Sequence, residues 1–271
     1  MPTMNYAFMS FSAPRLALAE LLGLATRFGY AGVEPRLGSN HAHGIEVDST
    51  PRERREIRDR VAQSGVALCC LATSCTYADP ATAPKWITET RRCIALAADV
   101  GAPCLRVFGG AIPPDLPRAA AIEQVTDALR SVAADAERHG VVLCLETHDD
   151  WTDPSHVADV VRRVDHPAVG VTWDYMHTTR TARRTVDQAF SVLRPWIKHV
   201  HFHDGADHAD RLVFLPIGAG DYDNRRMVEL LLGAGYDGYL SGEWINWEPY
   251  EVHLPRELAA ISALEQAVRA G

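Results

Sequence analysis

Four predicted strands in the second half of the chain carry, at or near their ends, a side chain that can bind a metal ion. In chain order these residues are Glu146, Asp174, His201 and Glu243. A carboxylate at the end of a core strand is costly unless it is paired or bound to a cation. Acids at adjacent strand ends would also repel one another, and a divalent cation would relieve that repulsion. The pattern therefore predicts one bound divalent cation.

The donor types indicate which cation this is. Two Glu, one Asp and one His form a mostly oxygen donor set. Such a set is typical of sites for Mn²⁺, Mg²⁺ or Co²⁺, whereas a thiolate zinc site would use cysteine ligands. We expect Mn²⁺ to be favoured, with Mg²⁺, Co²⁺ or Zn²⁺ as alternatives, and we expect no other cofactor.

Each acid also has a simpler structural explanation. Glu146 could pair with Arg106 on the neighbouring strand, and Asp174 could cap the segment that follows its strand. Glu243 could be an acid of a surface loop. Four separate structural roles are a less economical account of the joint pattern than one shared cation is.

The histidine of the set is the least determined member. His199, His201 and His203 share one face of their strand, because side chains repeat with period two. Any one of them could be a core histidine with satisfied hydrogen bonds. Spacing alone does not choose between His201 and His203 as the ligand.

The strands that carry these residues belong to an alternation of short apolar runs and longer amphipathic segments. Near-continuous apolar strands separated by helical segments indicate a parallel sheet covered on both faces. Eight such units predict an α/β protein with a single (β/α)8 barrel, whose active site lies at the C-terminal ends of the strands. The predicted strands are residues 4–9, 32–34, 66–71, 104–108, 141–146, 169–173, 199–203 and 239–243.

The amphipathic segments predict helices, since their apolar residues recur at helical spacing. Long polar or Pro-rich segments follow several strands, where loops that cover a site would lie. We find no linker or change of composition, so we expect one domain over residues 1–271. The predicted helices are residues 14–28, a segment that opens at Ser49, and residues 117–139, 185–195, 224–233 and 254–271.

Composition limits the class of protein. The net charge is −8, which disfavours a nucleic-acid backbone as the main partner. The chain shows no signal-peptide pattern and no apolar run of the roughly 20 residues that a membrane span needs, so we expect a cytoplasmic protein. Several of the six cysteines fall in apolar runs and no CxxC pair occurs, which predicts reduced, buried thiols.

Five segments resemble the xylose-isomerase-like sugar phosphate isomerase/epimerase superfamily, a group of TIM barrels. The resemblance covers nearly the whole chain, and the order of the segments is specific for the superfamily. They are "LETH" at 145–148, "WDYMH" at 173–177, "KHVHFHDG" at 198–205, "PIGAGDYD" at 216–223 and "GYDGYLSGEW" at 235–244.

The resemblance implies metal and catalytic roles. Glu146, Asp174, His201 and Glu243 match the family's metal ligands, and His203 matches the Lys of its "HVHIKD"-like strand. In ketose epimerases of this group the two Glu ligands also act as acid and base. They move a proton between adjacent carbons through a metal-stabilised enediolate. The resemblance thus implies a metal-dependent sugar isomerase or epimerase that is usually a dimer or tetramer and acts on a small carbohydrate.

The resemblance also implies a substrate-binding set. His177, three residues after the Asp, resembles a substrate-binding His of the family. Arg211 resembles a substrate Arg that follows strand seven, although the spacing here is longer. We expect His148, Arg106 and Trp244 to complete this set.

Departures from the epimerase pattern leave other reactions open. His148, Asp149 and Asp150 follow the first ligand, and an unusual stretch at residues 36–44 follows strand two, where it could contact substrate or be a solvated loop. Relatives in the superfamily dehydrate inososes and dehydroshikimate or eliminate from 3-keto sugars, so a lyase with the same site is the main alternative.

Two further alternatives are less favoured. Abasic-site endonucleases of this barrel type carry Asp-Arg-His after strand seven, whereas this chain has Asp210-Arg211-Leu212. A binding protein without catalysis would be expected to lack a ligand, and all four ligands are present.

Overall fold

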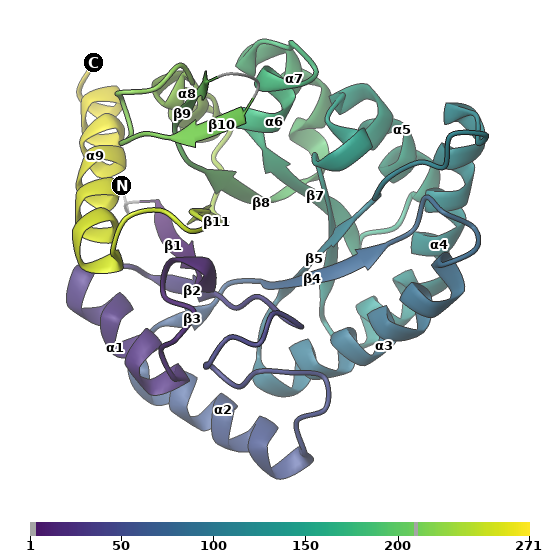
Figure 1. The fold of residues 1–271 in the computed structure, drawn as a ribbon, viewed down its shortest axis with the longest axis horizontal. Coiled ribbons are helices and arrows are strands. Elements are labelled where there is room, and N and C mark those ends of the chain that lie inside the picture. The colour runs from purple at the N-terminus through teal and green to yellow at the C-terminus, as the bar shows by residue number, and fades with distance from the viewer. Residues whose placement is uncertain (1–3, 209–210) are drawn as a thin grey trace.

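The computed structural model describes residues 4–208 and 211–271, and it has the predicted barrel architecture. Parallel strands form the centre and helices surround them (Figure 1). This confirms the predicted α/β barrel. The strands of the barrel sheet are β1 (Asn5–Met9), β2 (Gly32–Glu34), β3 (Ala67–Leu68), β4 (Leu71–Thr76), β5 (Cys104–Phe108), β6 (Val142–Glu146), β7 (Val169–Asp174), β8 (Ile197–Phe202) and β11 (Tyr239–Gly242).

The third barrel strand is divided into β3 and β4, which corrects the single strand predicted over residues 66–71. β2 pairs with β3, while β4 pairs with β5. Only Cys69 and Cys70 separate the two pieces, and both are buried beside Ala7 in a small cluster of their own. An isolated bridge between Arg36 and Ala72 connects the two ends of the sheet. The nine segments therefore make eight barrel strands, and the uninterrupted apolar run gave no signal for the break.

Helices cover the outside of the barrel. Several begin and end as their sequences predict: Thr50 and Glu53 form a capping box at the start of α2, and Gly65 ends it in the left-handed conformation. The final helix begins at Tyr250, earlier than the predicted residue 254. The helices are α1 (Leu18–Phe28), α2 (Pro51–Ser64), α3 (Ala83–Val100), α4 (Arg118–Arg138), α5 (Pro154–Val164), α6 (Tyr175–Arg180), α7 (Val186–Leu193), α8 (Asn224–Gly233) and α9 (Tyr250–Ala270).

Helices α3, α5 and α6 were not among the helix ranges predicted from the sequence, and neither was a further element. After β8 the chain forms an antiparallel pair, β9 (Gly205–His208) and β10 (Arg211–Phe214), outside the barrel sheet. Its mixed polar and apolar residues give no clear strand period. Asp210, which entered the comparison with the endonuclease pattern, lies outside the described residues.

Short buried strands and packed helices account for the apolar part of the sequence. Within residues 4–208 and 211–271, none of the helices combines the length and the apolar character that crossing a bilayer requires. The cysteines predicted to be buried are buried, except that Cys104 is half-buried.

Candidate metal centre

The four predicted ligands meet at one rim of the barrel. Their strands are neighbours in the sheet, in the order β11, β8, β7 and β6. Register places Asp174 beside His201, because these two residues are paired across β7 and β8. One donor atom from each of Glu146, Asp174, His201 and Glu243 lies within 4.8 Å of the others. We call these four residues the rim cluster.

His201 lies at the centre of the rim cluster. Its Nδ1 is 2.8 Å from Oε1 of Glu146 and 3.2 Å from Oε2 of Glu243. Burial alone would lower the pKa of His201, but the surrounding Glu34, Glu146 and Glu243 carboxylates raise it well above its usual value. The rim cluster therefore has the electrostatic environment of a cation site, and a proton on His201 is one way to neutralise it.

Two buried carboxylate oxygens of the rim cluster lack a hydrogen bond. They are Oε2 of Glu146 and Oδ2 of Asp174. Nε of Arg106 approaches Glu146 Oε2 to 3.3 Å, which is an ion pair, but neither atom has a hydrogen-bond partner. Such atoms are costly to bury. The donor set and its oxygens without hydrogen bonds fit a divalent cation, which would be held by Glu146, Asp174, His201 and Glu243.

The simpler explanations for Glu146 and Asp174 describe real contacts that coexist with the rim cluster. Arg106 does pair with Glu146. Burial would raise the pKa of Glu146, but the charges of Arg106 and His201 lower it to about 2. Asp174 does cap α6, since its Oδ1 accepts a hydrogen bond of 3.1 Å from the backbone N–H of His177. Glu243 is not a surface acid, because its side chain is only 12% exposed.

His203 occupies a different position from His201. Its Nδ1 donates to the backbone carbonyl of Glu243 at 3.0 Å, and its Nε2 lies 3.1 Å from Oδ2 of Asp174. Burial opposes protonation, but the Asp174 carboxylate raises the pKa of His203. His203 thus supports Asp174 from the side, whereas His201 contacts both glutamates.

Two further histidines lie beside the rim cluster. The rings of His148 and His177 are 4.5 Å apart, and Nε2 of His177 is 3.9 Å from Oδ2 of Asp174. His148 Nδ1 lies 2.8 Å from the Asp149 carboxylate. Burial would lower the pKa of His148, but the hydrogen bond to Asp149 and the charge of Glu146 raise it to about 9. The loop after β6 therefore brings a positively charged ring to the edge of the cluster.

Of the other predicted substrate-binding residues, only Arg106 lies in the rim region. It is buried on β5, with its guanidinium 4.0 Å above the Phe108 ring. Trp244 is fully buried and packs against Phe202 and His253, so its placement gives no support to a substrate contact. Neighbouring residues on an extended chain point to opposite sides, which directs Trp244 away when Glu243 faces inward. Arg211 is exposed at the start of β10.

The sequence interpretation missed Glu34. This residue ends β2 and is fully buried, and its carboxylate contacts both His199 and His201. The rule applied to strands five to eight, an acid at a strand end, would have found it, because Glu34 is the last residue of the predicted strand 32–34. His199, which was noted only as a core candidate, is its partner.

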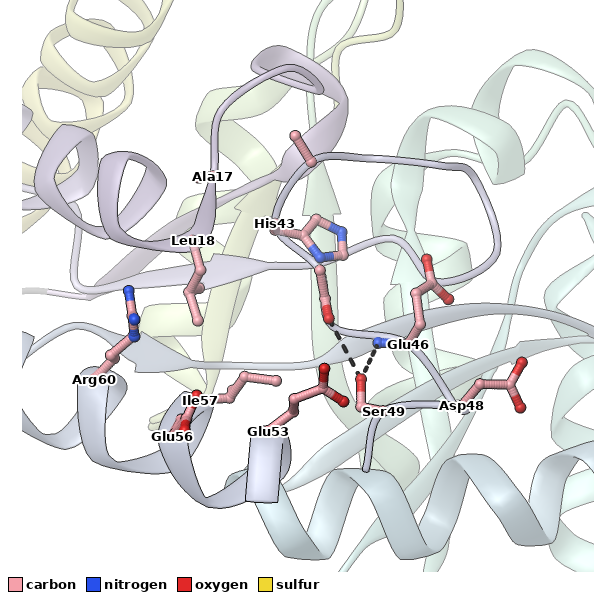
Figure 2. A pocket seen from close by; sticks show the side chains of 12 residues that line it. Ala17, Leu18, His43, Glu46, Asp48, Ser49, Glu53, Glu56, Ile57 and Arg60 are labelled. Carbon is pink, nitrogen blue, oxygen red and sulfur yellow. Dashed lines mark hydrogen bonds between the residues drawn. The ribbon is translucent and has the colours of Figure 1, made fainter. Parts of the chain in front are cut away.

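A second concentration of acids lies on the surface and differs in kind. A hollow of about 440 Å³ opens beside α2, and Figure 2 shows Glu46, Asp48, Glu53 and Glu56 around it. Among the described residues, these acids belong to neither of the groups whose donor atoms converge closely enough for a metal ion. We call this region the surface hollow.

A parallel barrel that gathers carboxylates and histidines at the carboxyl ends of its strands defines a class, the α/β barrels whose site lies at that rim. The sequence pattern of one family in this class matches residues 22–266. The chain belongs to this family, the xylose isomerase-like TIM barrels.

Individual relatives are enzymes with two kinds of reaction. A 3-dehydroshikimate dehydratase of Bacillus anthracis is 26% identical over 239 residues, which cover 84% of this chain and 82% of the dehydratase. The solved structure of an L-ribulose 3-epimerase has a TM-score of 0.81 at 17% identity, covering 98% of this chain and 96% of that one. A xylose isomerase-like barrel of Mycobacterium smegmatis in complex with magnesium has a TM-score of 0.73 at 19% identity, covering 99% and 100%. The dehydratase relative supports an enzyme, and the solved structures support the barrel fold.

Proposed function

We propose that this protein is a divalent-metal-dependent keto-sugar isomerase or epimerase, which removes a proton next to a carbonyl group and returns it at the same or a neighbouring carbon. The observation that carries this proposal is the rim cluster. Two of its buried carboxylate oxygens have no hydrogen bond, and all four donors lie within 4.8 Å of one another. A bound divalent cation would supply positive charge that stabilises the negative charge developing on the substrate oxygens.

Glu146 and Glu243 are the acid and base in this proposal. Glu146 ends β6 and Glu243 directly follows β11, and these strands flank β7 and β8 in the sheet, so the two carboxylates approach the cluster from different sides. Burial opposes ionisation, but His201 and Arg106 lower the pKa of both groups, so both carboxylates are charged near neutral pH and able to accept a proton. A base on one side of a substrate carbon and an acid on the other is what an epimerase needs.

Binding and orientation of the substrate fall to the neighbouring polar residues. Arg106, His148 and His177 are the predicted contacts that lie nearest the rim cluster. Their hydrogen-bond donors match hydroxyl and carbonyl oxygens of a polyhydroxylated substrate. Arg211, exposed on the β9–β10 hairpin, stays a prediction from the resemblance.

A dehydratase is the second candidate. It is favoured by the 26% identity to the 3-dehydroshikimate dehydratase, which extends over most of both chains. The first step would be the same proton abstraction. The second step would expel a β-hydroxyl as water, and His148, which Asp149 holds by a 2.8 Å contact, is the candidate proton donor to it.

The test is a panel of ketoses, keto-inositols and dehydroshikimate incubated with the protein and Mn²⁺ in D₂O and followed by ¹H NMR. The proposal predicts deuterium at a carbon next to the carbonyl, together with an isomer or epimer. A new alkene or enone would identify the dehydratase instead. Absence of both deuterium incorporation and a new alkene or enone from every substrate, with the metal bound, would contradict both reactions. Mg²⁺, Co²⁺ and Zn²⁺ are tested in parallel, because Mn²⁺ is preferred here only by the type of donor set.

A further inference from the structure

Glu34 is a buried acid that the proposed reaction does not use. It ends β2, beside Met9 of β1, and is fully buried. Its Oε2 lies 2.8 Å from Nε2 of His199, and its Oε1 lies 3.2 Å from Nε2 of His201. One carboxylate thus bridges two buried histidines of β8.

His201 is consequently held between carboxylates on both ring nitrogens. Nε2 faces Glu34, and Nδ1 faces Glu146 and Glu243. A neutral imidazole has one N–H and one lone pair, so it can donate to only one side. The nitrogen on the other side then has to carry a second proton, as in the metal-free imidazolium, or bind a metal cation if the contact is to be favourable. The two sides differ, because Nδ1 faces the two glutamates of the rim cluster, which also contains carboxylate oxygens without a hydrogen bond.

We propose that Glu34 is a positioning residue for the metal centre: it accepts the Nε2–H of His201 and so turns the Nδ1 lone pair toward the cation held by Glu146, Asp174 and Glu243. A carboxylate that binds the outer N–H of a metal-bound histidine fixes its tautomer and ring orientation and raises its basicity. His199 fixes the second oxygen of Glu34 and so prevents its rotation. The inference rests on the proposed function, since it presupposes that the rim cluster binds a cation.

A second cation held by Glu34, His199 and His201 is the competing explanation, since donor atoms of these three residues also lie within 4.8 Å of one another. It would need lone pairs on both nitrogens of His201 at once, which requires removing the last ring proton. A proton on Nε2 satisfies the same geometry without that cost.

The experiment is an EPR titration with Mn²⁺ on the wild-type protein, Glu34→Gln and Glu257→Gln. Glu34→Gln keeps an acceptor oxygen and the volume of the side chain but removes the charge. Glu257 is an equally buried glutamate on α9 that accepts a 2.8 Å hydrogen bond from the backbone N–H of Ile217. We expect one Mn²⁺ per chain in all three proteins, with the Mn²⁺ Kd of Glu34→Gln about 10- to 100-fold weaker. The Kd of Glu257→Gln should match that of the wild type.

The outcomes separate this inference from the proposed function. If the wild type binds neither Mn²⁺ nor Mg²⁺, Co²⁺ or Zn²⁺, the metal-dependent function fails and the inference fails with it. If the wild type binds one Mn²⁺ and Glu34→Gln binds it equally well, with an unchanged bound-metal spectrum, only the inference is overturned. Two Mn²⁺ per wild-type chain, one of them lost in Glu34→Gln, would also overturn the positioning role.

A measurement on the wild type covers the case in which Glu34→Gln does not fold. In the Zn²⁺-loaded, ¹⁵N-histidine-labelled protein, NMR reports which ring nitrogen of His201 carries the proton. The inference predicts a protonated Nε2 and a metal-bound Nδ1. A metal-bound Nε2, or a ring without a proton on either nitrogen, would overturn it.

Discussion

The rim cluster and the surface hollow are both rich in acids, yet their acids are satisfied in opposite ways. In the surface hollow, Glu53 accepts hydrogen bonds of 2.7 and 2.8 Å from Thr50, and Glu46 accepts two from the backbone N–H of Gly38. Glu53 is exposed and Glu46 is partly exposed. In the rim cluster, oxygens of Glu146 and Asp174 are buried without a hydrogen bond.

The difference shows that the number of acids does not identify a cation site. An exposed carboxylate with backbone N–H partners is already stabilised at the start of a helix or in a turn. A buried carboxylate oxygen without a hydrogen bond depends on nearby positive charge, which a bound cation would provide. The following predictions test this comparison, beginning with the largest expected effect.

Removing the charge of either glutamate of the rim cluster should nearly abolish turnover. We expect Glu146→Gln and Glu243→Gln to lower kcat by about 10²- to 10⁴-fold, the usual contribution of an acid or base. Steady-state kinetics on the substrate identified by NMR would measure it, with circular dichroism as the check on folding. Glu53→Gln in the surface hollow is the matched control and should leave kcat unchanged. Near-normal activity of either rim variant would refute the acid–base assignment.

Removing the positive charge of Arg106 from its buried ion pair with Glu146 should destabilise the metal-free protein. Arg106→Met leaves the Glu146 carboxylate buried beside an apolar side chain, and breaking a buried pair in this way costs about 3–5 kcal/mol. Urea unfolding would measure the loss. Arg92→Met, which breaks the exposed pair with Asp48 at the surface hollow, should change the free energy of unfolding far less. Equal effects of the two substitutions would remove the energetic distinction between the regions.

The metal affinity should rise with pH in the neutral range. The carboxylates around His201 raise its pKa well above 6.5, so the metal-free protein keeps a proton there that the cation must displace. We expect the Mn²⁺ Kd to tighten by about tenfold for each pH unit above 6.5 until that proton is lost, since one proton leaves per metal bound. Isothermal titration calorimetry in buffers of different ionisation enthalpy would measure the Kd and the number of protons released per metal bound.

Raised histidine pKa values also determine the direction in which the stability of the metal-free protein changes with pH. A raised folded-state pKa gives stability that is fully present below the ordinary histidine value and is lost as pH rises through the folded value. For His148 that interval runs from 6.5 to about 9. The metal-free protein should therefore lose stability over this range. Constant stability from pH 6.5 to 9, with no pH dependence of the Kd, would contradict the charge assignment of these histidines.

The smallest effect is expected from the helix cap beside the surface hollow. Thr50→Ala removes the side chain that accepts a hydrogen bond from the backbone N–H of Glu53, which should cost about 1 kcal/mol of stability. The Mn²⁺ Kd should not change. A shift in Kd would mean that the surface hollow and the rim cluster are coupled, which the comparison excludes.

The sequence predicted the barrel and the convergence of the rim cluster for a definite physical reason. Parallel strands end at one rim, so an acid at the end of residues 141–146 must approach one at the end of residues 239–243. Alternation of side chains also placed His199, His201 and His203 on one inward face. The ends of the strands and the two-residue alternation of their side chains thus predicted most residues of the site.

What the sequence left open depends on contacts between distant segments. Spacing could not choose between His201 and His203, because the choice rests on which ring meets Glu146 and which meets Asp174. The place of Glu34 at a strand end was readable from the sequence, but its pairing with two histidines far along the chain was not. The break at Cys69 and Cys70 follows from pairing with two different neighbours, which an apolar run does not encode.

The most direct test of the central claim is an anomalous diffraction measurement on crystals soaked in Mn²⁺. The account predicts one strong manganese peak per chain, within bonding distance of Glu146, Asp174, His201 Nδ1 and Glu243. A peak in the surface hollow with none at the rim cluster, or no peak at either place, would contradict it.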